Sequence, residues 1–234
     1  MTRKALVFAL AFLTAGAVAL YVASKIFERK PDKVGPDPGQ IKPRETVPVP
    51  TVKFTNVTAE SGIAFRHING ATGSKLLPET MGGGVAIFDY NGDGLPDILF
   101  IQSGLLPGHD SKDPPPTMKL YKNLGGFKFQ DVTKEVGLDV PMYGMGVCVG
   151  DIDNDGRPDI FVSCVGKHHL FHNVDGKRFE EITDTAGVGG GPDLPWKISR
   201  PEFIAWKEPI PFGSSCTFLD YDGDGKLDLF VCHY

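Results

Sequence analysis

The stretch FDYNGDGLPD, residues 88–97, places three aspartates, one asparagine and two glycines between two apolar runs. The run that ends at Phe88 is GVAIF, and the run that follows Asp97 is ILFI. Asp, Asn and Gly are common in turns between strands, because they hydrogen-bond to nearby backbone or adopt left-handed conformations. The same side chains could also surround a cation with oxygen atoms. The stretch alone therefore leaves two interpretations open.

The pattern D-x-[DN]-x-D-G-x-x-D occurs three times, beginning at Asp89, Asp151 and Asp220. Eleven of the 29 acidic residues lie in these three loops. A plain polar turn does not explain the same acidic or amide residues at the same positions three times over. Four such groups close together would also repel one another without a cation. The repetition favours a metal-binding loop.

Hard oxygen ligands in this number favour Ca²⁺ over Zn²⁺ or Cu²⁺. Loop positions 1, 3, 5 and 9 would supply side chains, position 7 a backbone carbonyl, and the glycine at position 6 permits a sharp turn. The first predicted site comprises Asp89, Asn91, Asp93, Asp97 and the carbonyl of Leu95. The second comprises Asp151, Asp153, Asp155, Asp159 and the carbonyl of Arg157. The third comprises Asp220, Asp222, Asp224, Asp228 and the carbonyl of Lys226.

An EF-hand is excluded, because its loop needs an acidic residue at position 12 and helices on both sides. Position 12 is here Phe100, Val162 or Val231, and the flanking runs are short and rich in strand-forming residues.

A second motif recurs out of phase with the loops, as FTNVTAESGI (54–63), FQDVTKEVGL (129–138) and FEEITDTAGV (179–188). LYKNLGG and LFHNVDG precede the second and third copies. One unit therefore reads as four short strands, which predicts an all-β chain of propeller blades. The predicted strands are 84–88, 97–102, 117–122 and 127–132, then 146–150, 159–164, 168–172 and 178–182, and finally 228–233 as the second strand of a third blade.

The copy at 54–63 is expected to form an orphan fourth strand that would close the last blade of a ring. Two whole blades, half of a third and one closing strand are fewer than a propeller needs. We therefore expect residues 51–234 to be a partial propeller, the N-terminal fragment of a longer protein.

The loops, together with LPETMGGGVAIFDYNGDG (77–94), LYKNLGGFKFQDVTKEVGL (120–138) and LDLFVCHY (227–234), resemble the FG-GAP/VCBS repeats of integrin α-subunit propellers. The similarity is greater to the branch that contains cartilage acidic protein and the ASPIC/UnbV-associated proteins, and it covers about residues 52–234. The resemblance implies a seven-bladed ring with Ca²⁺ in the loops between strands, located outside the cytoplasm. Asn91 departs from an all-Asp loop but keeps an oxygen ligand.

The N-terminus begins with Arg3 and Lys4, followed by nineteen uncharged residues at 5–23. A helix of that length spans roughly 28 Å, so residues 1–30 are expected to contain an apolar helix that acts as a signal anchor or a cleaved signal peptide. Residues 31–50 contain six prolines and read as a semi-rigid linker. The cations on both sides of the apolar run leave the orientation open. We expect an extracytoplasmic domain, periplasmic or at the cell surface, anchored through residues 5–23.

The four cysteines leave two interpretations open, disulfides or buried free thiols. Cys148 and Cys164 lie at equal distances from Gly156 and could face each other if a hairpin turned there; Cys216 and Cys232 meet the same test less well. Among His168, His169 and His172, alternation along one predicted strand puts His169 opposite to the other two, so they are not interpreted as a metal cluster. His169 and His172 align with Lys119 and Lys122 of the preceding unit, which predicts exposed polar positions.

The net charge of −5 gives no reason to expect a nucleic-acid partner. No GxSxG, HExxH or phosphate-binding glycine loop is found, and the insertions around His67, Glu79, Trp196 and Trp206 contain no recognisable catalytic set. The sequence thus predicts a membrane-tethered, calcium-stabilised module that binds an extracellular protein or glycan without catalysis. The alternatives are a propeller domain of an enzyme acting on extracellular polysaccharide, or a lectin.

Overall fold

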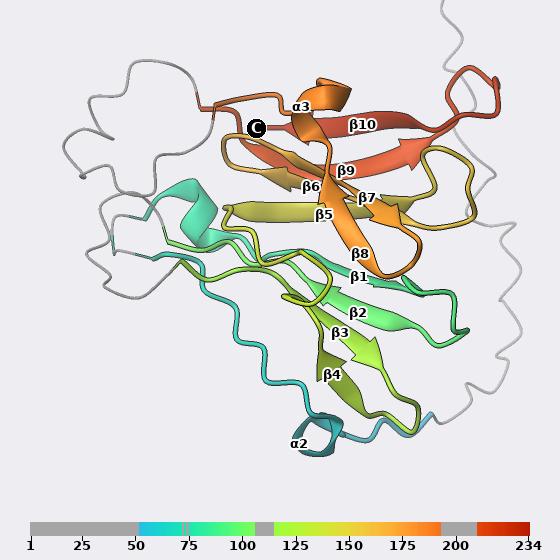
Figure 1. The fold of residues 1–234 in the computed structure, drawn as a ribbon. Helices are drawn as coiled ribbons and strands as arrows, with labels where there is room; N and C mark the ends of the chain where they lie inside the picture. The colour runs from blue at the N-terminus through green and yellow to red at the C-terminus, as the bar shows by residue number, and fades with distance from the viewer. Residues whose placement is uncertain (1–51, 72, 74, 106–114, 193–209) are drawn as a thin grey trace, which may run out of the picture. The chain divides into compact units, whose positions relative to one another are not determined.

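Three antiparallel sheets account for the strands in the part of the chain that the computed structural model describes, which is residues 52–71, 73, 75–105, 115–192 and 210–234. Residues 54–234 form one compact unit. The first sheet has the order β1-β2-β3-β4, the second β5-β6-β7-β8, and the third pairs β10 with β9 (Figure 1). Consecutive strands are neighbours throughout, which is the arrangement of a propeller blade.

The strands are short, as expected for blades. The first sheet contains β1 (Val85–Phe88), β2 (Asp97–Phe100), β3 (Lys119–Asn123) and β4 (Phe129–Asp131). The second contains β5 (Gly144–Gly150), β6 (Asp159–Cys164), β7 (His169–Val174) and β8 (Arg178–Glu181). The third contains β9 (Gly213–Leu219) and β10 (Asp228–His233). The remaining elements are the helices α2 (Thr58–Ser61) and α3 (Thr183–Ala186) and the 3₁₀ helix η2 (Leu77–Thr80).

Both complete sheets confirm the four-stranded unit, and predicted and observed strand ends differ by at most two residues. The register repeats as well. Phe88 pairs with Asp97, Gly150 with Asp159 and Leu219 with Asp228, so each acidic loop is enclosed by the same strand pair. The first strand of the second sheet contacts the first strands of both neighbouring sheets, β1 and β9. The fold is therefore mostly β, with sheets that match propeller blades.

The orphan strand predicted from the 54–63 motif is wrong, because residues 54–57 form no strand and α2 follows them. In the other two copies the phenylalanine half of the motif pairs with a preceding strand, β3 or β7. The first copy has no such strand before it in the described residues. A strand needs a hydrogen-bonding neighbour, whereas the V-T-x-x half can close a helical turn with local bonds alone.

The hairpin pairings of the cysteines, one of the two interpretations left open by the sequence, do not form, because the register places Cys148 opposite Phe161 and Cys232 opposite Ser215. The acidic loop is not symmetric about its sixth-position glycine, and a bulge between Gly144 and Gly146 shifts the register further. All four cysteines are free thiols in the structure.

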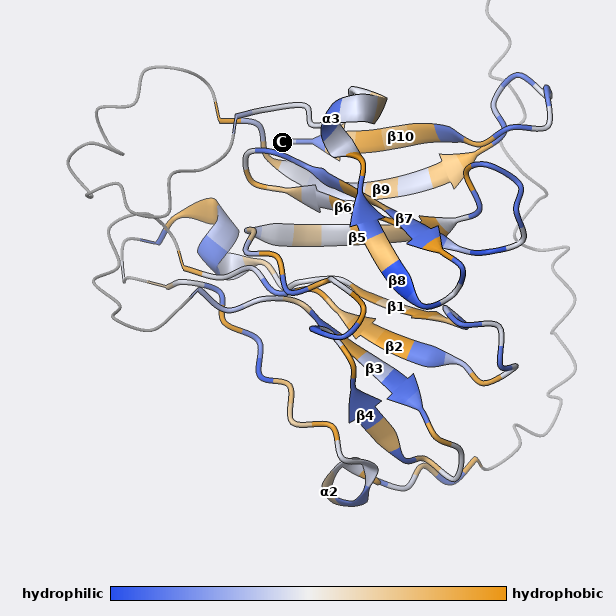
Figure 2. Ribbon diagram, viewed as in Figure 1, coloured by the Kyte–Doolittle hydropathy of each residue, from blue (hydrophilic) through white to orange (hydrophobic). Residues whose placement is uncertain are grey.

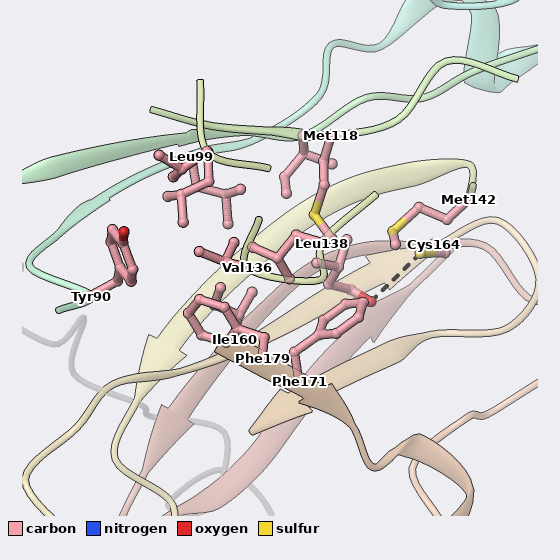
Figure 3. Close-up of a cluster of buried hydrophobic side chains, with 14 residues drawn as sticks. Tyr90, Leu99, Met118, Val136, Leu138, Met142, Ile160, Cys164, Phe171 and Phe179 are labelled. Carbon is pink, nitrogen blue, oxygen red and sulfur yellow. Dashed lines mark hydrogen bonds between the residues drawn. The ribbon is translucent and has the colours of Figure 1, made fainter. Parts of the chain in front are cut away.

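The main core lies between the first and second sheets (Figure 3). Leu99 of β2 faces it from one sheet, and Ile160 of β6 and Phe171 of β7 from the other, each completely buried. Val136 and Leu138, from the connection between β4 and β5, also belong to this cluster. Burial of several large side chains at roughly 1.5–3 kcal/mol each is enough to hold two such sheets together.

The outer sheets each have an apolar face that the described residues leave uncovered. Val85 and Ile87 of β1 are 56% and 68% exposed, and Phe230 of β10 is 59% exposed. By contrast, every residue of β6 in the central sheet is buried. Figure 2 shows the hydrophobic colouring along β2 and β10 and the hydrophilic colouring of the loop between β5 and β6.

The predicted N-terminal segment and linker, residues 1–50, lie outside the described residues. No helix among the described residues is long and apolar enough to cross a bilayer.

Candidate metal centres

The aspartate at loop position 1 organises each turn by accepting backbone hydrogen bonds. Asp89 Oδ1 accepts the N–H groups of Gly92 and Asp93 at 2.9 and 3.2 Å, and its Oδ2 accepts that of Gly94 at 2.7 Å. Asp220 accepts the corresponding three bonds at 2.8, 3.1 and 3.0 Å. Asp151 accepts two of them, from Asp155 at 2.9 Å and Gly156 at 2.7 Å. The backbone therefore coils around this carboxylate in all three loops.

Positions 3 and 5 continue the coil. The position-3 oxygen, from Asn91, Asp153 or Asp222, accepts the N–H of position 5 at 3.1–3.2 Å. The position-5 aspartate in turn accepts the N–H of position 7 at 2.8–3.0 Å. Each of these backbone bonds uses one of the roughly four lone-pair sites of an aspartate carboxylate, so oxygen capacity remains for a cation.

Left-handed backbone at positions 4 and 6 makes this coil possible. Gly94, Gly156 and Gly225 have φ values of 82°, 85° and 82°, as the predicted sharp turn requires. Position 4 is left-handed too, and in the second loop a non-glycine, Asn154, holds it at φ 60°. Asparagine tolerates this region better than most residues.

The aspartate at position 9 fastens the loop to its sheet. Asp97 and Asp159 are completely buried, and each accepts the N–H of loop position 2 and that of an asparagine on the third strand. Burial raises the pKa of both carboxyls, partly offset by these hydrogen bonds. Asp228 makes the bond to Tyr221 N–H at 2.9 Å but is exposed.

Carboxylate oxygens converge in the second and third loops. Asp151, Asp153 and Asp155 each offer an oxygen within 4.8 Å of the others, and Asp220, Asp222 and Asp228 do the same. Such clusters of hard oxygen donors suit Ca²⁺, whose oxygen ligands lie 2.3–2.6 Å from the ion. The carbonyls of Leu95, Arg157 and Lys226 remain predicted ligands.

In the first two loops a cation already stands beside the position-5 aspartate. Lys122 Nζ lies 3.3 Å from Asp93 Oδ2, and Asn91 Nδ2 donates to the same oxygen at 3.1 Å. The Leu95 N–H bond, with smaller contributions from Asn91 and Lys122, lowers the pKa of Asp93. In the second loop the equivalent cation is Arg157, whose guanidinium contacts Asp155.

The prediction that His169 is an exposed polar position is wrong, because it is 8% exposed. His168 is buried as well, at 2% exposed. His168 Nδ1 accepts the N–H of Cys164, and its Nε2 lies 2.9 Å from Nε2 of His233.

His172 is a site residue that sequence reasoning missed. Its Nδ1 lies 3.0 Å from Asp159 Oδ1 and its Nε2 3.9 Å from Asp153 Oδ2, so it joins the second loop's acidic group. The only signal available was its alignment with Lys122, which stands beside the first loop in the same way.

His67 and Glu79 belong to the first of the two insertions noted in the sequence. His67 Nε2 accepts the Gly83 N–H at 3.2 Å and lies 3.0 Å from Ser103 Oγ, and burial lowers its pKa. Glu79 is buried at the end of the same segment, in η2. These contacts hold the insertion against the first sheet. Trp196 and Trp206, on which the lectin alternative rests, lie outside the described residues.

An FG-GAP-like repeat is recognised over residues 89–162, from the first aspartate of the first loop to β6. Cartilage acidic protein 1 from Xenopus tropicalis is 27% identical over an alignment that covers 49% of this chain and 24% of that protein. The chain thus contains an FG-GAP-like repeat and is distantly similar to cartilage acidic protein 1, as the resemblance predicted. It matches about a quarter of that relative's length.

Proposed function

We propose that this chain, which carries an FG-GAP-like repeat, is a calcium-stabilised segment of a β-propeller that acts outside the cytoplasm as a non-catalytic binding module. The observation that carries the proposal is the repeated coil of the three acidic loops. In each loop the position-1 carboxylate accepts the N–H groups of positions 5 and 6, although the loops lie up to 131 residues apart in sequence.

Calcium would be held by Asp151, Asp153, Asp155 and Asp159 in the second loop and by the equivalent residues in the other two. When bound, Ca²⁺ supplies positive charge that offsets repulsion between carboxylates only a few ångströms apart. The protein's part is to preform the coil, since the backbone bonds to position 1 fix the turn before any ion arrives. The Ca²⁺ site is therefore structural in this proposal.

Further sheets would complete the ring. The first sheet leaves a groove of about 470 Å³ lined by Ile87, Ile98, Phe100 and Phe129, among others. Contiguous apolar surface of this kind marks an interaction face. We propose that another blade covers it, and that a second one covers the exposed side of β10, as expected for the seven-bladed ring.

Binding would use polar surface outside the loops. A groove of about 600 Å³ beside the first sheet is lined by Arg66, Lys119, Tyr121, Lys134 and Asp139, among others. Lys119 and Lys134 already pair with Asp131 and Asp139 at 3.2 and 3.7 Å. Exposed ion pairs of this type are weak, so a charged protein or glycan could exchange them for its own groups.

Calcium titration tests the structural role. We expect isothermal titration to detect heat on adding Ca²⁺, with dissociation constants of about 10⁻⁴–10⁻³ M, and millimolar Ca²⁺ to raise the melting temperature. The double variant Asp153→Asn/Asp222→Asn should lose most of this rise. Asp184→Asn is the matched control, because Asp184 is an exposed aspartate outside the loops.

Equal melting temperatures with calcium and with chelator would remove the calcium proposal. Location is tested separately by adding protease to intact cells that express the full chain. Digestion of residues 54–234 is expected, and complete protection would contradict an extracytoplasmic module.

A further inference from the structure

The second and third sheets approach each other most closely where β5 faces β9. A β-carbon built on Gly146 would lie 2.9 Å from Cα of Ser215, and one built on Gly150 would lie 2.9 Å from the Phe218 ring. Only glycine permits this approach at the two positions. Alternate residues of a strand share one face, so Cys148, between the two glycines, also faces β9.

Cys216 stands at the matching level of β9. Its Sγ lies 3.8 Å from the carbonyl oxygen of Phe161, and Phe161 is the residue that pairs with Cys148 across β5 and β6. The two thiols lie close enough for each to be the largest cause of the other's pKa shift. Neither side chain is completely buried.

The pKa values of the two thiols are shifted in opposite directions. The hydrogen bond from Cys148, followed by bonds from Ser163, lowers the pKa of Cys216 despite its burial. The same thiol–thiol bond, together with burial, raises the pKa of Cys148. A low-pKa thiol beside a second thiol is the arrangement of a reactive cysteine and its resolving partner.

We infer that Cys148 and Cys216 form a disulfide that joins the second sheet to the third when the protein meets a disulfide oxidant. The backbones of β5 and β9 touch at Gly146 and Ser215, two residues before Cys148 and one before Cys216, and a disulfide needs such a close approach of the two strands. The inference does not depend on calcium binding.

The reaction is two thiol–disulfide exchanges with a small-molecule disulfide, RSSR. The Cys216 thiolate attacks one sulfur of RSSR, the S–S bond breaks, and one RS⁻ leaves. Cys148 then loses its proton to solvent and attacks the Cys216 sulfur of the mixed disulfide, which expels the second RS⁻. The two protein thiols are oxidised by two electrons in total, and RSSR is reduced to two RSH.

The other two cysteines are placed differently. Cys164 is completely buried, and burial raises its pKa well above the usual value. Cys232 lies on β10, where its register partner is Ser215. Cys164 and Cys232 therefore serve as matched controls for the proposed pair.

The experiment uses the full chain, reduced and then treated with oxidised glutathione at constant calcium. We expect free thiols to fall from four to two, and a non-reducing peptide map to show the Cys148 peptide joined to the Cys216 peptide. The link would close a long segment, so the melting temperature should rise by about 5–15 °C and fall back with dithiothreitol. Cys164→Ser and Cys232→Ser should keep the link, and Cys148→Ser and Cys216→Ser should lose it.

Three results would overturn the inference: four free thiols after oxidation, a map that joins any other pair, or glutathione that stays on Cys216 without being displaced. The peptide map on the unchanged sequence decides the matter even if a serine variant fails to fold.

Discussion

The first and second sheets share one sequence plan and one topology, yet they differ in what covers them. Both run β-strand, acidic loop, β-strand, connection and hairpin, with equivalent register. Ile98 of β2 and Ile160 of β6 occupy the same position after the last loop aspartate. Ile160 is completely buried against the first sheet, whereas Ile98 is only half-buried.

This difference shows that burial in a stacked fold is set by the neighbouring sheet and not by the repeat itself. The second sheet lies between two others and is apolar on both faces. The first sheet presents the same kind of face to a groove. The repeat therefore encodes two contact faces in every unit, whether or not a neighbour is present.

The largest expected contrast comes from the same substitution at the two equivalent isoleucines. Ile160→Ala should cost about 3 kcal/mol of unfolding free energy, because it leaves a cavity in a closed core. Ile98→Ala should cost about 1 kcal/mol, because less apolar area is buried there. Urea denaturation measures both. Similar losses at the two sites would mean that the first sheet is covered in solution.

A second contrast between the two sheets is how their stability responds to low pH. His168 and Met118 occupy equivalent buried positions before the third strand of each sheet. Burial, with His233 and His169 nearby, lowers the pKa of His168 to about 4. As the pH falls, the His168 imidazole is protonated in the unfolded chain before it is protonated in the folded one. The stability that neutral His168 contributes is therefore complete above about pH 6.5 and is lost as the pH falls toward 4. Between pH 7 and pH 5 the loss should be about 2 kcal/mol.

Replacing His168 with the residue of the first sheet, His168→Met, isolates this effect. The variant should lose about 1 kcal/mol at pH 7, because the Cys164 N–H loses its acceptor. Its decline between pH 7 and pH 5 should be correspondingly flatter than in the unchanged protein. Parallel pH profiles for the two proteins would show that His168 is not the acid-sensitive group.

The smallest expected contrast is in how much loop position 3 contributes to calcium-induced stabilisation in the first and second loops. Asn91 and Asp153 both occupy loop position 3, and both accept the position-5 N–H. Exchanging the residue types, Asn91→Asp in one variant and Asp153→Asn in another, changes one ligand charge with little change in shape. The calcium-induced stabilisation should grow in the first variant and shrink in the second, by about 1 kcal/mol each. Melting curves with Ca²⁺ and with chelator measure this. A smaller stabilisation in Asn91→Asp together with a larger one in Asp153→Asn would refute a ligand role for position 3.

The strands, their order and the shape of the acidic loops could be predicted because each depends on residues close together in sequence. Position 1 of a loop and the N–H groups that it accepts lie within five residues of each other. The closing strand at 54–57 could not be predicted, since a strand exists only where a partner strand lies beside it. The sequence left the cysteine pairing open for a related reason, because the acidic loop is not symmetric about Gly156 and the register across β5 and β6 is fixed only when the strands pair.

The sequence by itself therefore determined the repeat, the turn glycines and the carboxylates, because backbone bonds within nine residues hold them whatever surrounds the loop. Tertiary structure alone decided that His172 joins the second acidic group, that His168 is buried, and that Cys148 meets Cys216. These contacts join separate strands or separate sheets, so they exist only once the sheets have paired and stacked. No periodicity within one unit specifies which side chain of the next will face it.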